Sequence, residues 1–180
     1  MNLAVFISGR GSNLKALLDA QGEGYFPSEI KLVVSNKEAE GLDYARDTGI
    51  DYLVSKDDAE IIRTMKEKNI DLVVLAGYLP KISKDLIDNF TLINIHPSLL
   101  PKYGGKGYYG MNVHRAVFEN GEKTSGVTVH YVNEKLDDGK IILQREVDIS
   151  GCESAEEVAD EVLVVEHEIL KDAIKLLEEK

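Results

Sequence analysis

The chain has 180 residues, 43% of them hydrophobic and 29% charged, which is typical of one globular domain with its own core. A formal net charge of −11 argues against a nucleic-acid partner, because a protein that binds a phosphate backbone needs a basic face. No apolar run approaches the roughly 18 residues of a membrane span and no basic leader precedes the first apolar run, so we expect no membrane partner and a cytoplasmic location.

Strand and helix patterns alternate through the first half of the chain. Short apolar runs predict strands that are buried on both faces, and the segments between them predict helices. The predicted strands are 3–7, 30–34, 52–54, 71–76 and 92–95, and the predicted helices are 13–21, 37–48, 57–69 and 84–89. This alternation is typical of a parallel α/β sheet with right-handed crossovers and helices on both faces.

The second half of the chain has a different pattern. A segment rich in Pro, Gly and Tyr, 101–110, precedes a predicted helix over 111–119. Apolar residues alternate with more polar ones in 127–131 and again in 141–143, which predicts an antiparallel hairpin with a long connection. Residues 154–179 predict one long amphipathic helix, because apolar residues recur there at helical spacing.

A glycine-rich loop, SGRGSN over 8–13, follows the first predicted strand and leads into a helix. Free amide groups at a helix N-terminus bind anions, and the helix dipole adds to the attraction. Leu14 stands where the third glycine of a dinucleotide fingerprint belongs. A single phosphate monoester held by the amides of Gly11, Ser12 and Asn13 therefore fits better than a dinucleotide. A tight turn without a ligand is the alternative.

Two further sets of residues lie at predicted strand ends. Asn94 and His96 end the fifth strand two positions apart, so that their side chains point the same way, and Pro97 stops the strand. The loop Gly77–Ile82 follows the fourth strand and could wall a site for an aromatic ring. Because the carboxyl ends of parallel strands share one edge, we expect both sets to meet the glycine-rich loop. A structural histidine and ordinary core residues are the alternatives.

The connection of the hairpin contains Leu136–Gly139, which reads Leu-Asp-Asp-Gly. Asp-Gly pairs are common in turns, so both aspartates could simply form the turn. A carboxylate that reaches an imidazole favours the charged form of the ring. His96, Asn94 and one aspartate would then form an acid–base site with a donor for an oxyanion. His114 and His130 lack such settings, and we expect His130 to be structural or to support the site indirectly.

The single cysteine, Cys152, excludes an internal disulfide and a cysteine-based metal cluster. No histidine lies beside it in sequence and no motif surrounds it, so we predict a packed thiol rather than a nucleophile. The chemistry outlined above needs no metal, and we predict none.

Four segments together resemble the folate-dependent glycinamide ribonucleotide transformylases, or phosphoribosylglycinamide formyltransferases. They are ISGRGSNL, DLVVLAGYL, NIHPSLLPKY and GVTVHYVNEKLDDGKIILQ, and they follow the family's order through almost the whole chain. The resemblance implies a Rossmann-like formyltransferase fold in one domain over 1–180, with a phosphate-binding half over 1–100 and a folate-binding half over 101–180. It also implies transfer of formyl from 10-formyltetrahydrofolate to the amine of glycinamide ribonucleotide in purine synthesis.

The resemblance also assigns roles to particular residues. The catalytic Asn, His and Asp of the family fall on Asn94, His96 and Asp137, and Asn94 also lies in the folate site. The phosphate loop falls on Gly11–Asn13, and a glutamate that faces the glycinamide falls on Glu166. The folate-contacting positions are Tyr78, Leu79, Pro80, Lys81, Ile82, Asn133, Glu134, Lys135, Leu136 and Asp137.

The implied mechanism fits the chemistry of these side chains. The amine attacks the formyl carbon, and the resulting tetrahedral oxyanion is stabilised by the Asn94 amide and the His96 imidazolium. Asp137 assists by keeping His96 charged and by helping, through water, to remove a proton from the amine.

Two departures from the family pattern leave contacts open. Some relatives carry Arg in the loop after the fourth strand, where this chain has Pro80 and Lys81, so Lys81 or Lys56 is expected to take its place beside the folate glutamate tail. The loop over 104–110 is longer than in some members, and the resemblance assigns it no contact.

Three other classes share parts of this pattern. A formyltetrahydrofolate hydrolase reads His-His-Ser where this chain has His96-Pro97-Ser98, and it carries an additional N-terminal domain. A methionyl-tRNA formyltransferase has a further C-terminal domain and a basic surface. A non-catalytic nucleotide-binding protein would keep the glycine-rich loop without needing Asn94, His96 and Asp137 together. Monomer and homodimer both remain open.

Overall fold

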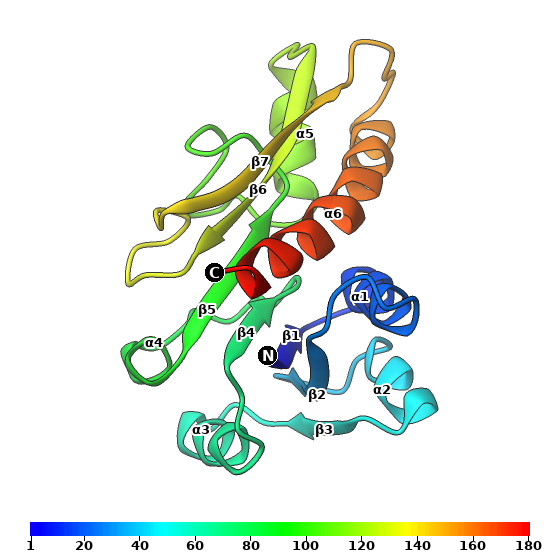
Figure 1. The fold of residues 1–180 in the computed structure, drawn as a ribbon. Coiled ribbons are helices and arrows are strands. Elements are labelled where there is room, and N and C mark those ends of the chain that lie inside the picture. The colour runs from blue at the N-terminus through cyan, green and yellow to red at the C-terminus, as the bar shows by residue number, and fades with distance from the viewer.

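The computed structural model describes residues 1–180, and a seven-stranded sheet in it carries helices on both faces (Figure 1). The strands are β1 (Asn2–Ile7), β2 (Glu29–Ser35), β3 (Asp51–Val54), β4 (Leu72–Leu75), β5 (Thr91–His96), β6 (Thr124–Tyr131) and β7 (Ile141–Asp148). The helices are α1 (Ser12–Gly22), α2 (Leu42–Thr48), α3 (Asp58–Glu67), α4 (Lys84–Asn89), α5 (Met111–Glu119) and α6 (Ala155–Glu178). Every predicted element is present, although several boundaries differ.

The strand order of the sheet is β3-β2-β1-β4-β5-β6-β7. β1 to β5 pair in parallel, whereas β6 pairs antiparallel with both β5 and β7. The predicted class, a mostly parallel sheet completed by a hairpin and a long helix, is confirmed. After β1, the chain adds β2 and β3 to one side of β1. It then crosses over and adds β4 and the later strands to the other side. Ligands bind beside such a reversal, at the carboxyl ends of the strands.

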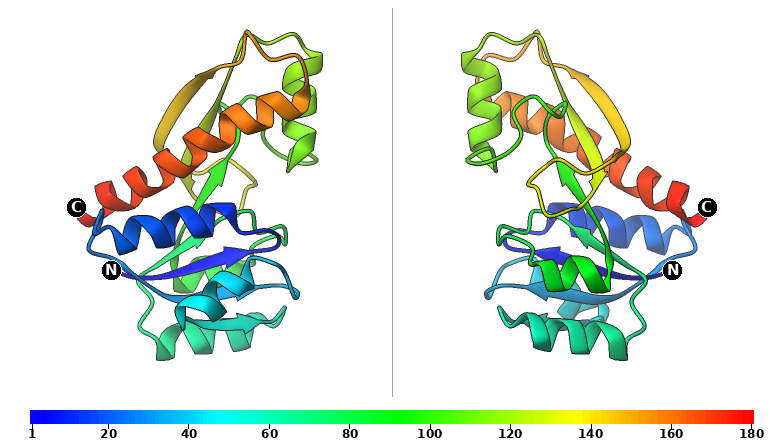
Figure 2. Two further views of the ribbon diagram at one scale, coloured as in Figure 1. Left: turned by 90° about the vertical axis from the view of Figure 1, so that its right-hand side faces the viewer. Right: turned by 90° about the vertical axis from the view of Figure 1, so that its left-hand side faces the viewer.

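β1 illustrates why the central strands are apolar without interruption. Leu3, Val5 and Ile7 belong to the core cluster that also contains α1 and α6 residues, whereas Ala4 and Phe6 belong to the cluster with α3 and α4 residues. Successive side chains of a strand point to opposite faces, so a strand covered on both faces needs apolar residues at every position. α1 and α6 lie side by side on the first face (Figure 2).

The helix predicted over 37–48 begins only at Leu42. The Gly41 N–H donates to the Gly9 carbonyl at 2.9 Å, and a Cβ atom on Gly41 would lie 2.7 Å from Cδ1 of Ile7. The segment before Leu42 thus packs against the glycine-rich loop in an irregular conformation. The predicted start was wrong because the pattern of polar and apolar residues does not reveal this tertiary contact.

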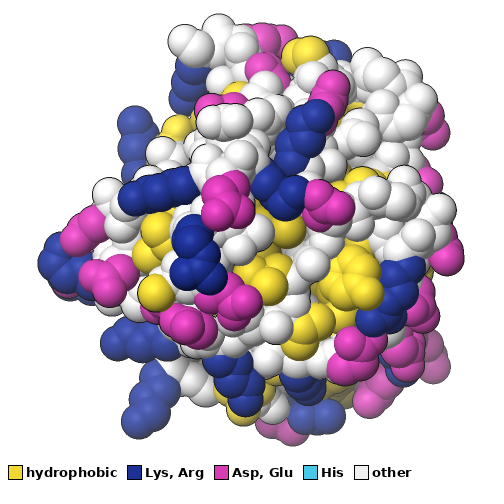
Figure 3. Space-filling view, turned by 90° about the horizontal axis from the view of Figure 1, so that it is seen from below, with side chains coloured by type: hydrophobic (Ala, Val, Ile, Leu, Met, Phe, Trp, Pro, Cys, Tyr) yellow, Lys and Arg dark blue, Asp and Glu magenta, His cyan; other side chains and the backbone are white.

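β3 differs from the prediction that all early strands are buried on both faces. It is the edge strand of the sheet, and its Tyr52 and Val54 are 43% and 41% exposed. The Arg46 guanidinium lies 4.9 Å from the centre of the Tyr52 ring. The face with β3 and α3 shows apolar side chains between basic and acidic ones (Figure 3).

No helix is both long enough and apolar enough to cross a membrane.

Candidate functional site

One cavity of about 730 Å³ lies where β4 and β5 end beside the connection between β6 and β7. Its lining includes 77–82, 94–97, 105–110, 132–137, Asn13, His114, His130 and Glu166. All predicted folate positions and all three predicted catalytic residues thus line the same cavity. Of the predicted phosphate loop, only Asn13 does, while Gly11 and Ser12 lie outside the lining. Lys81 lines the cavity and Lys56 does not.

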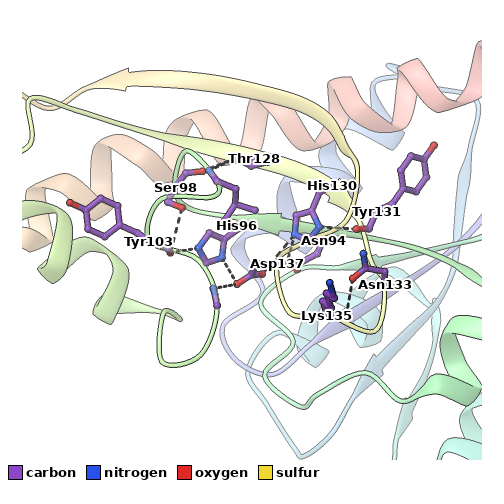
Figure 4. A network of polar contacts seen from close by, with 12 residues as sticks. Asn94, His96, Ser98, Tyr103, Thr128, His130, Tyr131, Asn133, Lys135 and Asp137 are labelled. Carbon is purple, nitrogen blue, oxygen red and sulfur yellow. Dashed lines mark hydrogen bonds and ion pairs between the residues drawn. The ribbon is translucent and has the colours of Figure 1, made fainter.

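His96 and Asp137 are buried lining residues of the cavity and face each other (Figure 4). The His96 side chain is 6% exposed and that of Asp137 is 7% exposed, and Nδ1 of His96 lies 3.7 Å from Oδ2 of Asp137. Nε2 of His96 lies 2.7 Å from the Tyr103 carbonyl oxygen. A carbonyl only accepts hydrogen bonds, so Nε2 carries a proton and Nδ1 is the ring atom that faces the carboxylate. The Tyr103 carbonyl therefore fixes the ring through Nε2, and Nδ1 is directed to the site.

Asp137 is fixed by the backbone rather than free on a turn. The Gly105 N–H donates to its Oδ2 at 2.9 Å, and the φ angle of Asp137 is 53°, in the left-handed region that Asp tolerates better than most residues. Its neighbour Asp138 is exposed. Of the two aspartates in the Leu-Asp-Asp-Gly turn, the structure thus brings Asp137 to His96 and leaves Asp138 in solvent.

Asn94 lies beside His130, which the sequence suggested to be structural or to support the site indirectly. Nδ2 of Asn94 lies 3.3 Å from Nε2 of His130, and Nδ1 of His130 lies 2.8 Å from the Tyr131 carbonyl oxygen. His130 is 2% exposed, and burial lowers its pKa below the ordinary value. The neutral ring thus donates from Nδ1 to the carbonyl and accepts a hydrogen bond from the Asn94 amide at Nε2.

The glycine-rich loop sets the start of α1. Gly11 has a φ angle of 75°, and a Cβ atom there would lie 2.9 Å from Cα of Gly41, so this position requires glycine. The first N–H groups of a helix have no partner within it, and the first turn of α1 holds no acidic residue. The local geometry is therefore open to an anion at the α1 N-terminus.

Asn13 and Glu166 form another buried polar pair of the cavity wall. Both are 9% exposed, and the Asn13 amide donates from Nδ2 to Oε1 of Glu166 at 3.3 Å. Burial raises the pKa of Glu166 to about 7, and the bond from Asn13 opposes this shift. Oδ1 of Asn13 is buried without a partner. Buried polar atoms are almost always paired, so an unpaired one in a cavity wall suits a polar ligand.

His114 adds a second unpaired polar atom to the wall. Its Nδ1 is buried without a partner. Burial and the nearby His96 together lower the pKa of His114 to about 4, so its ring is neutral at pH 7. The sequence provided no reason to place His114 at the site, because it lies on α5 and not at the end of a strand.

The loops opposite Asn13 and Glu166 carry exposed apolar side chains. Leu79 and Leu136 are 60% and 64% exposed. Beneath Leu79, the Ser8 hydroxyl accepts from the Leu79 N–H at 2.9 Å and donates to Oδ1 of Asn36 at 2.7 Å. Nζ of Lys84 lies 3.7 Å from Oε1 of Glu134, which links the start of α4 to the hairpin connection. An apolar wall of this kind suits a flat, largely apolar ligand group.

The sequence missed the groups that hold the central residues in place. The Tyr103 carbonyl and the Gly105 amide belong to the segment after β5, and neither type of group leaves a signal in a sequence. The 105–110 segment also lines the cavity, although the resemblance assigned it no contact. Its glycine content was the available signal, because close backbone approach favours glycine. No group of three or more His, Cys, Asp or Glu side chains lies close enough together to hold a metal ion.

The known sequences that this chain resembles are formyl transferases. A family model described as formyl transferase matches residues 1–174. The chain is 41% identical over 187 residues to "Phosphoribosylglycinamide formyltransferase, chloroplastic" of Vigna unguiculata, which covers 97% of the chain and 60% of that relative. It is 38% identical over 181 residues to "Phosphoribosylglycinamide formyltransferase" of Escherichia coli (strain K12), covering 94% of the chain and 83% of that relative. The chain thus spans about 60% of the length of the plant protein.

Solved structures agree with the sequence comparisons. The fold matches glycinamide ribonucleotide transformylase 1 from Symbiobacterium toebii with a TM-score of 0.90 and 34% identity, covering 99% of this chain and 88% of the other. It matches phosphoribosylglycinamide formyltransferase from Bacillus Halodurans with a TM-score of 0.89 and 30% identity, covering 98% and 95% of the two chains. The similarity therefore extends over nearly the whole chain.

Proposed function

Because the chain belongs to the formyl transferase family, we propose that it transfers the formyl group of 10-formyltetrahydrofolate to the amine of glycinamide ribonucleotide, a step of purine synthesis. One observation carries the proposal beyond the family. Asn94 and His96 on β5 meet Asp137, from the distant connection between β6 and β7, in the wall of one cavity. A protein that only bound a nucleotide would not need this buried group of an amide, an imidazole and a carboxylate.

The proposed roles follow from the chemistry of amine attack on a formyl carbon. Negative charge develops on the formyl oxygen, and an N–H of Asn94 and a protonated Nδ1 of His96 stabilise it. Asp137 lies 3.7 Å from that Nδ1 and attracts a proton held there. Its carboxylate also accepts, through water, the proton that the amine releases, and a proton passes to N10 of the folate as the bond between N10 and the formyl carbon breaks. No step requires a metal.

The two proposed substrates divide the cavity between them. The ribonucleotide phosphate binds the free amides of Gly11–Asn13, and the glycinamide end reaches Glu166. The folate takes the side lined by Tyr78–Ile82, by Asn94 and by Asn133–Asp137. We propose Lys81 rather than Lys56 for contact with the folate glutamate tail, because only Lys81 lines the cavity. The unpaired Oδ1 of Asn13 and the exposed Leu79 and Leu136 support this division, because the first suits a polar ligand and the others an apolar one.

The remaining parts of the proposal concern organisation and location. We assign residues 1–100 to the phosphate-binding half and 101–180 to the folate-binding half of one domain. The protein acts in the cytoplasm, as a monomer or homodimer, without a nucleic-acid or membrane partner. The net charge of −11 supports the exclusion of nucleic acid. Two plant relatives, 41% and 38% identical to this chain, are named as chloroplastic, so location does not follow from the activity.

The test combines purified protein, glycinamide ribonucleotide and 10-formyltetrahydrofolate, and follows the deformylated folate by absorbance. We expect folate release that depends on the ribonucleotide, with one formylated ribonucleotide formed for each folate released. Release at the same rate without the ribonucleotide would identify a hydrolase instead. Ribonucleotide binding with no release at all would identify a nucleotide-binding protein.

A further inference from the structure

We propose that His130 is a positioning residue for this reaction, which fixes the side-chain amide of Asn94 so that one N–H of Asn94 is directed into the cavity. The inference rests on the proposed function, because it assigns a purpose to a donor that matters only if an oxyanion forms. His130 itself accepts a hydrogen bond from Asn94 and acts through it.

The sheet brings the two residues together. β5 and β6 pair antiparallel, and Asn94 is directly opposite His130 in the register. Side chains of directly opposite residues lie on the same face of a sheet. The pairing of β6 with β7 shifts between Val129 and His130. Such irregularities locally bend a strand and redirect a side chain, and they are common beside active sites.

The hydrogen bonds of His130 determine which way the Asn94 amide is turned. Nδ1 of His130 lies 2.8 Å from the Tyr131 carbonyl oxygen, which can only accept, so Nδ1 carries the proton of the neutral ring. Nε2 is then an acceptor, and the atom of Asn94 that faces it at 3.3 Å must be the donor Nδ2. An amide turned the other way would set an oxygen lone pair against a nitrogen lone pair. One N–H of Asn94 thus donates to His130, and the other N–H is available to the cavity.

Gly139 explains how the Tyr131 carbonyl can occupy this place. A Cβ atom on Gly139 would lie 1.6 Å from the Tyr131 carbonyl oxygen, far inside any possible contact. The glycine of the Leu-Asp-Asp-Gly turn therefore leaves room for the carbonyl that fixes the His130 ring. One turn thus supplies Asp137 to His96 and, through Gly139 and Tyr131, secures His130 beside Asn94.

The surroundings of His130 keep its ring in the accepting form. It is 2% exposed, which disfavours a charged ring. Asp137 Oδ1 lies 3.8 Å from Nε2 and favours a proton there, while His96 opposes one. Burial is the largest of these influences, and the pKa of His130 is lowered. A second proton on Nε2 would turn the acceptor into a donor and lose the Asn94 bond.

The first test compares two replacements of His130. His130→Leu removes the acceptor at similar size, and we expect kcat to fall about tenfold with the KM of both substrates nearly unchanged. His130→Gln offers Oε1 as an acceptor close to the position of Nε2, and we expect it to recover most of the loss. His167→Gln on α6, outside the cavity lining, is the control for changing a half-buried histidine. Equal losses for the Leu and Gln variants would overturn the proposal.

A double-mutant cycle separates positioning from a merely structural role. If His130 acts only through the Asn94 amide, His130→Leu has almost no further effect on kcat in an Asn94→Ala background. A loss of the same factor in both backgrounds would show that His130 acts independently of Asn94.

A spectroscopic measurement keeps this proposal separate from the proposed function. The ¹⁵N signals of the His130 ring at pH 7 should show a neutral ring protonated on Nδ1, whether or not the protein transfers formyl groups. A ring protonated on Nε2 would refute the positioning role. Absence of ribonucleotide-dependent transfer by the unmodified protein would instead refute the function.

Discussion

The two walls of the cavity are built differently. On one wall, Asn13 and Glu166 stand on the helices α1 and α6 and are only 9% exposed. On the other, Leu79 and Leu136 stand on loops and are 60% and 64% exposed. The helical wall has its shape and its polar pairing before any ligand binds, while the loop wall offers apolar surface that a ligand would cover. Asn94 and His96 stand at the end of β5, and Asp137 meets His96 from the loop wall.

The largest effect is expected at the end of β5. In the proposed mechanism, Asn94→Ala or His96→Ala removes one oxyanion donor, which typically costs about 2.7–4 kcal/mol of transition-state stabilisation, so we expect turnover to fall roughly a hundredfold or more. Steady-state kinetics and circular dichroism test this, because folding and the KM values should change little. Asn89→Ala on the exposed surface of α4 is the control. Turnover near that of the unmodified protein in either variant would contradict the assignment.

Glu166 on the helical wall should make stability depend on pH. Its pKa is raised to about 7 in the fold from 4.5. Between these values the folded state keeps a proton that the unfolded state has released, so the unfolding free energy should fall by about 3 kcal/mol as the pH rises through this range. The contribution is complete below pH 4.5 and lost above pH 7. Urea unfolding of the protein and of Glu166→Gln at several pH values measures this dependence. An unfolding free energy that changes with pH in the same way in both proteins would refute the prediction.

Asn13 on the same wall should affect only one substrate. Asn13→Ala removes the bond to Glu166 and the free Oδ1 while keeping the backbone amide of α1. We expect the KM for the ribonucleotide to rise about tenfold, the size of one hydrogen bond to a charged or strongly polar partner. The KM for the folate should stay the same. A matching rise in both KM values would mean that the two walls are not separate.

The smallest effect is expected on the loop wall. Leu136→Ser removes apolar surface that is 64% exposed and hence contributes little to folding. We expect the folate KM to rise about threefold to tenfold, since covering one such side chain is worth of order 1 kcal/mol. Thermal unfolding should be unchanged. Val164→Ser, at an equally exposed position on α6, is the control.

The sequence predicted the parallel sheet well, because its strands carry a strong local signal. β1 from Leu3 onward and β4 throughout are apolar, as strands between two helical layers must be. The start of α2 was wrong because the contact of Gly41 with Gly9 joins two loops and leaves no periodic pattern. β3 was wrongly expected to be buried, because a short apolar run does not distinguish a central strand from an edge strand.

The site was predicted in part, and the limit is again the kind of interaction involved. Asn94 and His96 could be paired from their spacing on one strand. The chemistry of the side chains joined one of the two turn aspartates to them, and only the family resemblance selected Asp137 over Asp138. The Tyr103 carbonyl and the Gly105 amide could not be found, because backbone groups are the same at every position. His130 could have been placed only with the antiparallel register known.

The Ser8 hydroxyl has a consequence for inhibitors. It binds the Leu79 backbone and the Asn36 side chain at once, and so ties the ends of β1, β2 and β4 together beneath the loop wall. Leu79 therefore projects from an anchored base, and its position should vary little from one bound compound to another. Antifolates that differ in shape near Leu79 should therefore differ clearly in affinity. Antifolates that differ near Leu136, at the exposed end of the hairpin connection, should have more similar affinities.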